Sequence, residues 1–189
     1  MKITEFLKNS ESFFHFINSI VKAEDRREIL DKLVEDIRDY IGADRCTLFI
    51  YDKQARELVS RVAQQHEEVR LPANKRTLTG YTFLTGKNCC VTDAYDENEL
   101  KRIDPEIQVS SQWDEKSGYK TMHILTTAII ARGKRVGVFM ALNKPGGFIA
   151  YSVQGALEFT PLLGLAVEIV LLDEALKEGK KLEDLPFDC

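Results

Sequence analysis

The sequence lacks most of the residue patterns that would point to a metal site or to covalent catalysis. Its 189 residues include four cysteines, three histidines and one tryptophan. No Cys-x-x-Cys pair or His/Cys cluster offers zinc ligands, and the cysteine usage is that of a reduced protein rather than a disulfide framework. No Ser/His/Asp set, paired-carboxylate motif or phosphate-cradling glycine loop stands out. We therefore expect no metal site and no catalytic residues.

An excess of charge of one sign is also absent. The net charge of −4 provides no electrostatic footprint for nucleic acid or for an anionic membrane surface. The most apolar stretch, residues 162–172, is interrupted by Glu168 and is too short to span a bilayer. The first residues lack the apolar centre of a signal peptide. We expect a cytoplasmic protein that binds no nucleic acid and does not insert into membranes.

The composition that remains is ordinary for a globular chain, at 44% hydrophobic and 30% charged residues. Such a chain can bury a sizeable core, and its length suits one domain with extra helices better than two domains. We expect an N-terminal amphipathic helix in residues 1–23 and the domain itself in residues 24–176. Residues 177–189 are predicted to be a charged tail or the start of a linker to a further domain.

Helical spacing of apolar residues predicts long helices at both ends of the domain. Apolar residues at this spacing occupy residues 3–21, and a second helix follows, capped by Asp25 and stopped at Gly42. The last helix is predicted from about Ser152 to about Glu178, with Pro161 marking a kink or a second start.

Shorter elements are predicted between these helices. Thr79 is expected to cap a short helix that ends at Gly86, and Asp93 to cap another that contains Tyr95 and Leu100. Strands are predicted over residues 46–51, 58–63, 89–92, 122–131 and 136–142. Antiparallel hairpins between terminal helices indicate an α+β fold with one sheet between helical layers.

Residues 114–125 read Asp-Glu-Lys-Ser-Gly-Tyr-Lys-Thr-Met-His-Ile-Leu, and residues 136–144 read Val-Gly-Val-Phe-Met-Ala-Leu-Asn-Lys. Together with residues 79–87 and 91–95, in this order, they resemble the GAF domain, closest in motif to the GAF domains of cyclic nucleotide phosphodiesterases and bacterial adenylyl cyclases. The motif residues that match are Gly118, Tyr119, Asn143, Lys144 and Phe148. The resemblance covers roughly residues 25–176.

The resemblance implies a central antiparallel sheet of about six strands. The terminal helices would cover one face, and loops with short helices would enclose a small-molecule pocket on the other. Members of this family often dimerise, and some bind a cyclic nucleotide, haem, a bilin or another small metabolite. This chain departs from the subgroup at Ser152 and Val153, which stand where the pattern has Asp-Glu. In that pattern the Asp would form an ion pair with the Lys at the position of Lys144. Ser152 cannot form this ion pair, which argues against cyclic nucleotide binding.

Six residues are candidates for ligand binding. The backbone N–H groups of a helix that opens at Asp93, Ala94 and Tyr95 would suit an anion, and the Tyr95 ring would suit a flat ligand. Thr126 or Thr127 would offer a hydroxyl, and Trp113 would form a lid or contact a partner. Each of these residues also has a purely structural interpretation, as a helix cap, a packed ring or a strand residue.

For two other kinds of side chain, cysteine and histidine, both a chemical and a structural role are possible. Cys89 and Cys90 would suit a thiol-dependent reductase of free methionine sulfoxide, or they pack as small hydrophobes. His123, at the start of a strand, would ligate haem or make a structural hydrogen bond. Three functions follow: a ligand-binding regulatory domain of a larger signalling protein, an interaction module without a ligand, and the reductase. We expect a homodimer through the terminal helices, with a possible C-terminal output domain.

Overall fold

The computed structural model describes residues 27–63, 68–108, 114–115 and 118–187. The helices are α2 (Arg27–Ile41), α3 (Leu78–Thr85), α4 (Glu97–Ile103) and α6 (Ala150–Glu178), with a short 3-10 helix at Leu182–Asp184. The strands are β1 (Arg45–Asp52), β2 (Glu57–Ala63), β3 (Arg70–Pro72), β4 (Cys89–Val91), β5 (Ile124–Ala131) and β6 (Lys134–Leu142). The helix predicted over residues 3–21 and the Asp25 cap lie outside the described residues, as do Trp113 and Cys189.

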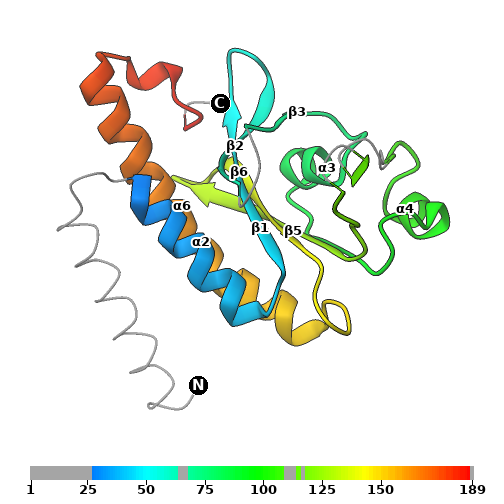
Figure 1. Cartoon of the computed structure of the whole chain (residues 1–189). Helices are drawn as coiled ribbons and strands as arrows, with labels where there is room; N and C mark the ends of the chain where they lie inside the picture. The colour runs from blue at the N-terminus through cyan, green and yellow to red at the C-terminus, as the bar shows by residue number, and fades with distance from the viewer. Residues whose placement is uncertain (1–26, 64–67, 109–113, 116–117, 188–189) are drawn as a thin grey trace.

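All six strands belong to one antiparallel sheet in the order β3-β2-β1-β6-β5-β4. Figure 1 shows α2 and α6 side by side on one face of this sheet and α3 and α4 on the other. The predicted α+β fold with about six strands is therefore confirmed. The short strand β3 was not predicted, because three residues in a polar stretch carry no alternation of apolar side chains.

The main core lies between the sheet and the two long helices. β5 is buried at seven of its eight positions, since helices cover both faces of the sheet there. α2 packs Val34 and Ile37 against this core, and α6 packs Leu163 and Val167. α6 is the one helix among the described residues that is long and apolar enough to cross a membrane. Here one stripe of its apolar residues packs on the sheet.

Two predicted element limits are corrected, and one predicted turn is confirmed. The cap of α3 is Thr77 rather than Thr79, because the Thr77 hydroxyl accepts the Gly80 N–H. α6 runs continuously through Pro161, so no second helix starts there. The hairpin between β5 and β6 is confirmed as a two-residue turn, in which Arg132 and Gly133 both have positive φ, the geometry of a type I′ turn.

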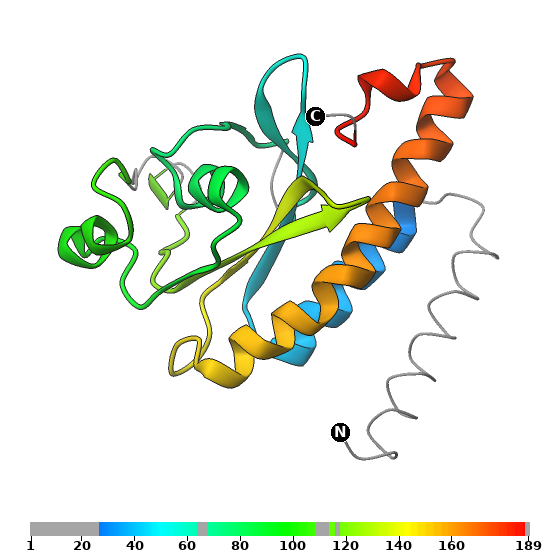
Figure 2. The same cartoon turned by 180° about the vertical axis from the view of Figure 1, so that it is seen from behind.

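The segment after α6, which was predicted as a charged tail or the start of a linker, packs in part on the domain. α6 ends at Glu178, and the chain then folds back toward the sheet, as both views show (Figures 1 and 2). Leu185 and Phe187 from this segment are buried in the main core. The sequence prediction missed this because two apolar residues among charges carry no periodicity.

Candidate functional site

The sheet face beneath α3 and α4 is where a ligand was expected. α3 sits on this face through Leu78, Tyr81 and Phe83, which are buried. Its first turn touches the preceding chain so closely that a Cβ at Gly80 would lie 2.0 Å from the Asn74 carbonyl oxygen. Only glycine fits at that contact, which ties α3 to the segment before it.

Thr126 and Thr127, the two candidate hydroxyls on β5, point to opposite faces of the sheet. The Thr126 hydroxyl faces α3 and lies 2.7 Å from the Thr82 hydroxyl, which also contacts the Cys89 thiol. Thr127 pairs across the sheet with Phe139, whose side chain belongs to the core under α6. Only Thr126 therefore lies on the predicted ligand face, and its hydroxyl already has a partner.

The helix expected at Asp93 begins four residues later. α4 starts at Glu97, and its cap is Asp96, whose carboxylate accepts the N–H groups of Asn98 and Glu99. Asp93 instead forms a turn in which its carboxylate accepts the Tyr95 N–H at 2.9 Å. Asp93 and Asp96 are three residues apart, and tertiary contacts of the residues between them determine that Asp96 is the cap.

The backbone N–H groups proposed to meet an anion have partners within the protein. The Asp93 N–H donates to the Glu99 carboxylate at 3.0 Å, and the Ala94 N–H donates to the Met122 carbonyl at 2.7 Å. With the Tyr95 N–H bound to Asp93, all three donors are used. Glu99 occupies the place that an anionic ligand would take at the Asp93 N–H, so these three donors are not free for an anion in this structure.

Asp114 connects the segment around Tyr95 to the start of β5. Its carboxylate accepts the Tyr95 hydroxyl at 2.7 Å, the Thr121 N–H at 2.6 Å and the Thr121 hydroxyl at 2.8 Å. Burial opposes ionisation of Asp114, but these hydrogen bonds and the nearby Arg45 outweigh it and lower the pKa of the carboxyl. Burial and the same hydrogen bond raise the pKa of Tyr95 to about 12.

Tyr119, from the same motif, is held between two residues that precede and open β1. Its hydroxyl donates to the Asp44 carboxylate at 2.7 Å, and the Arg45 guanidinium carbon lies 3.6 Å from the centre of its ring. Burial, followed by the hydrogen bond to Asp44, raises the pKa of Tyr119. Gly118 precedes it with a φ of 69°, which lets the chain turn into this position.

Asn143 fastens the end of β6 to the chain entering β5. Its side-chain oxygen accepts the N–H groups of Met122 and His123, and its amide nitrogen donates to the Lys120 carbonyl. Its φ of 47° is left-handed, a conformation that asparagine tolerates better than most residues. The motif residues Gly118, Tyr119 and Asn143 thus brace one end of the sheet.

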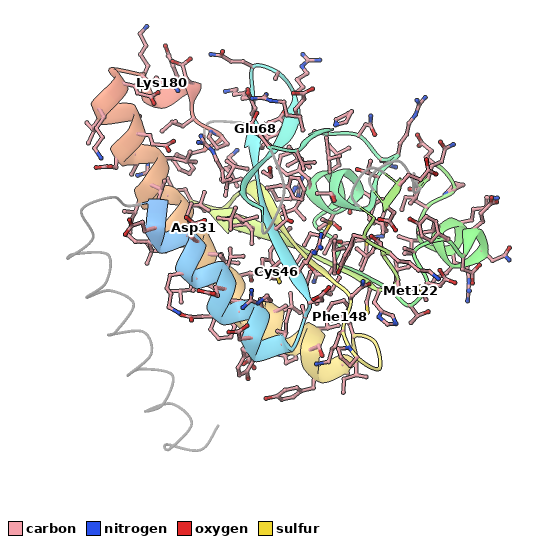
Figure 3. All side chains as sticks on the ribbon, viewed as in Figure 1. Asp31, Cys46, Glu68, Met122, Phe148 and Lys180 are labelled. Atoms are coloured by element: carbon pink, nitrogen blue, oxygen red, sulfur yellow. The ribbon has the colours of Figure 1, made fainter. Side chains whose placement is uncertain are left out.

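Lys144 has a structural partner although the acidic residue of the subgroup is missing. Its ammonium group donates to the Ile41 carbonyl, so it caps the C-terminal end of α2, where a positive charge is favourable. Ser152 is buried, and its hydroxyl has no hydrogen-bond partner among the described residues. Phe148 is buried in the core, close to the start of α6 (Figure 3).

The thiols and His123 do not form a reactive group in the described part of the chain. Cys89 is buried and Cys90 is half-buried, and burial raises the pKa of both thiols. His123 lies near Gly147, at an open depression that Asp44 and Lys144 also line, rather than on the face beneath α3. In the described residues no three Asp, Glu, His or Cys side chains gather as metal ligands.

The structure therefore brings together part of the predicted site. Tyr95 is joined to Asp114, while Thr127 lies on the other face. Sequence reasoning missed Glu99, Thr82 and the role of Asp114 itself. Asp114 had a signal, since it opens the quoted motif, but Glu99 and Thr82 are ordinary helix residues whose partners are set by tertiary contacts.

Comparison with known proteins extends this description. The chain matches the family model described as GAF domain over residues 25–167. It is 24% identical to a probable 3′,5′-cyclic phosphodiesterase, pde-5, of Caenorhabditis elegans, over 95% of this chain. The match covers 25% of that relative, so the chain spans about a quarter of the relative's length.

Solved structures show the same fold. The GAF domain of an Acinetobacter phosphoenolpyruvate-protein phosphotransferase superposes with a TM-score of 0.60 at 13% identity, over 89% of this chain and 96% of that one. The free methionine-R-sulfoxide reductase of Neisseria meningitidis superposes with a TM-score of 0.62 at 16% identity, over 84% of this chain and 87% of that one.

Proposed function

This chain belongs to the GAF domain family, whose members are regulatory and sensory domains of signalling proteins, and we propose that it relays a signal by pairing its helical layer with a second copy. The phosphodiesterase relative is about four times longer than this chain, which supports a place in a larger signalling protein. Pairing through helices requires an apolar surface that the domain does not bury within itself.

α6 carries such a surface, and this observation supports the proposal most directly. Apolar residues recur along it at alternating intervals of three and four, the spacing of a coiled-coil seam. They are Leu162, Leu165, Ile169, Leu172 and Leu176. Leu165 and Leu176 are exposed, Leu176 by 84%, whereas Leu162, Ile169 and Leu172 are partly buried against the main core. The fully buried residues that face the sheet, such as Leu163 and Val167, form the neighbouring stripe.

Aromatic residues extend the exposed surface at the other end of α6. Tyr151 is 65% exposed and Tyr40, on α2, is 47% exposed. Their hydroxyls lie 3.2 Å apart, and the Tyr40 ring meets Phe159 edge-on. Tyrosine combines a large apolar surface with a polar tip, which suits an interface that is wet at its rim.

Sedimentation velocity across micromolar concentrations tests the pairing. We expect a dimer for the wild type and a shift to monomer for Leu165→Glu and Leu176→Glu, because each buries a charge in the seam. Leu84→Glu is the matched control, since Leu84 is 41% exposed but lies on α3. A wild type that stays monomeric throughout, or seam variants that behave like the control, would rule out the homodimer.

Small-molecule sensing is a second candidate, supported by the phosphodiesterase relative. A cyclic nucleotide or another small metabolite would bind on the face beneath α3 and α4, where an anionic group would have to displace Glu99 from the Asp93 N–H. Haem has no support from His123, which does not lie on that face. Native mass spectrometry and thermal shift with a nucleotide and metabolite panel test this. The absence of any co-purified species, together with the absence of a thermal shift at a saturating concentration of every compound, would count against small-molecule sensing.

The reductase alternative is weaker. GAF domains are in general non-catalytic, and the raised pKa of the Cys89 and Cys90 thiols works against the thiolate that the reaction needs. Similarity of fold to the Neisseria enzyme does not supply a reactive thiolate. Activity on free methionine sulfoxide that is lost in Cys89→Ser or Cys90→Ser would reverse this conclusion.

A further inference from the structure

The chain leaves α6 through a defined stop and reverses direction. Gly179 adopts a φ of 67°, and its N–H and that of Lys180 both reach the Ala175 carbonyl. This left-handed glycine ends the helix and turns the chain, as in other helix C-caps. Figure 3 labels Lys180 at this turn, and Figures 1 and 2 show the following segment returning toward the sheet.

The returning segment is held by contacts to both turns at one end of the sheet. From the β1–β2 turn, the Lys53 ammonium donates to the Glu183 carbonyl at 3.3 Å. From the β5–β6 turn, the Arg132 guanidinium carbon lies 5.3 Å from the centre of the Phe187 ring. Arg132 also pairs with Glu168 on α6 at 2.7 Å, so one side chain links the turn, the helix and the segment.

Two apolar side chains seat the segment, and an open crevice lies beside it. Leu185 is 6% exposed and Phe187 is 5% exposed, and both join the main core. The crevice, of about 260 Å³, lies between the segment, the sheet and α6, and charged residues are prominent in its lining. The connecting residues, Lys180 to Asp184, are mostly charged. Because the segment is anchored mainly at one end, its local opening is expected to need less free energy than unfolding of the domain.

We propose that the segment Lys180 to Phe187 acts as a clasp. It packs between the two turns and α6, and it detaches as a unit while the domain stays folded. When it is packed on the domain, the clasp sets the direction of the chain after α6. Because Arg132 contacts both the clasp and α6, a shift of the β5–β6 turn or of α6 changes how firmly it is held. This regulation does not depend on whether α6 pairs with a second copy.

Limited digestion of the full chain with trypsin, followed by intact mass spectrometry, tests the clasp. Lys180 and Lys181 are exposed, but a protease also needs the surrounding chain in extended form, which the closed clasp denies. We expect Phe187→Ala to accelerate loss of the segment about tenfold or more, because cleavage follows the population of the open state. Arg132→Gln, which leaves the apolar packing intact, is expected to accelerate it less.

Two comparisons make the result decisive. Leu84→Ala, at an exposed position on α3 away from the clasp, is the matched control and is expected to leave the rate unchanged. Cleavage at Arg45, which opens the central strand β1 at the other end of the sheet from the clasp, reports opening of the whole domain. Cleavage at Lys180 and Lys181 that rises while cleavage at Arg45 stays constant supports the clasp. If all variants are cleaved at equal rates, or if cleavage accelerates at all three sites together, the segment is a fixed part of the core and the clasp is ruled out.

Discussion

At the scale of single residues, neighbouring side chains of the same type have different roles in this fold. Thr126 and Thr127 are both fully buried on β5. The Thr126 hydroxyl is hydrogen-bonded to Thr82, whereas the Thr127 hydroxyl has no partner among the described residues. A buried hydroxyl without a partner loses its hydration and gains nothing in return, so the two threonines contribute to stability with opposite sign.

This difference predicts opposite effects of one substitution. Thr126→Val leaves the Thr82 hydroxyl with only its weak contact to the Cys89 thiol and is expected to lower the free energy of unfolding by about 1–3 kcal/mol. Thr127→Val removes an unpartnered hydroxyl at nearly constant volume and is expected to be neutral or to stabilise by about 1 kcal/mol. Chemical denaturation of both variants measures the two effects. Equal losses in both would contradict the assignment of the hydrogen bond.

At the scale of elements, α6 lies on β5 at a contact that excludes a side chain. A Cβ at Gly164 would lie 2.0 Å from the Ile130 carbonyl oxygen, a backbone atom that cannot move alone. Gly155, on the same helix, would place a Cβ 2.8 Å from the Tyr40 ring. Tyr40 is half exposed and can turn aside. The two glycines therefore differ in what surrounds them, although a helix disfavours both.

Gly164→Ala is accordingly expected to cost about 1–3 kcal/mol, because it forces α6 away from β5. Gly155→Ala should remain within about 1 kcal/mol of the wild type, since the gain in helix propensity offsets the movement of Tyr40. Thermal unfolding of the pair provides the measurement. A Gly164→Ala protein as stable as Gly155→Ala would mean that α6 does not approach β5 this closely.

At the scale of the whole molecule, Asp114 makes the stability of the domain depend on pH. Its carboxylate joins the segment before α4 to the start of β5, and folding lowers its pKa. A carboxyl whose pKa is lower in the folded state contributes fully above the pKa of the unfolded chain, which is about 4. That contribution is lost as the pH falls from there through the folded pKa.

Asp114→Asn is therefore expected to lower the free energy of unfolding by roughly 1.5–3 kcal/mol at neutral pH. The gap to the wild type should narrow as the pH drops below about 4, because the wild-type carboxyl is then protonated as well. Denaturation curves at a series of pH values give this gap directly. Glu106→Gln, at an exposed carboxylate, serves as the control. A gap that stays constant with pH would show that the carboxylate charge is not what matters.

The sequence alone determined the order of the long helices and strands, the fold class and the family. These follow from local signals: apolar periodicity in α2 and α6, alternation and turn residues around β1, β5 and β6, and a motif whose residues are close together in the chain. Asn143 and Tyr119 were singled out for the same reason, because the motif itself contains them.

Only the tertiary structure decided which groups meet. Glu99 reaches the Asp93 N–H, Lys144 caps α2 without an acidic partner, and Phe187 returns to a core that the sequence assigned to other residues. Each contact joins residues whose partners are not marked by any local pattern. Burial and hydrogen bonding select such partners by distance in space, and distance in space is fixed only when the sheet and its two layers have assembled.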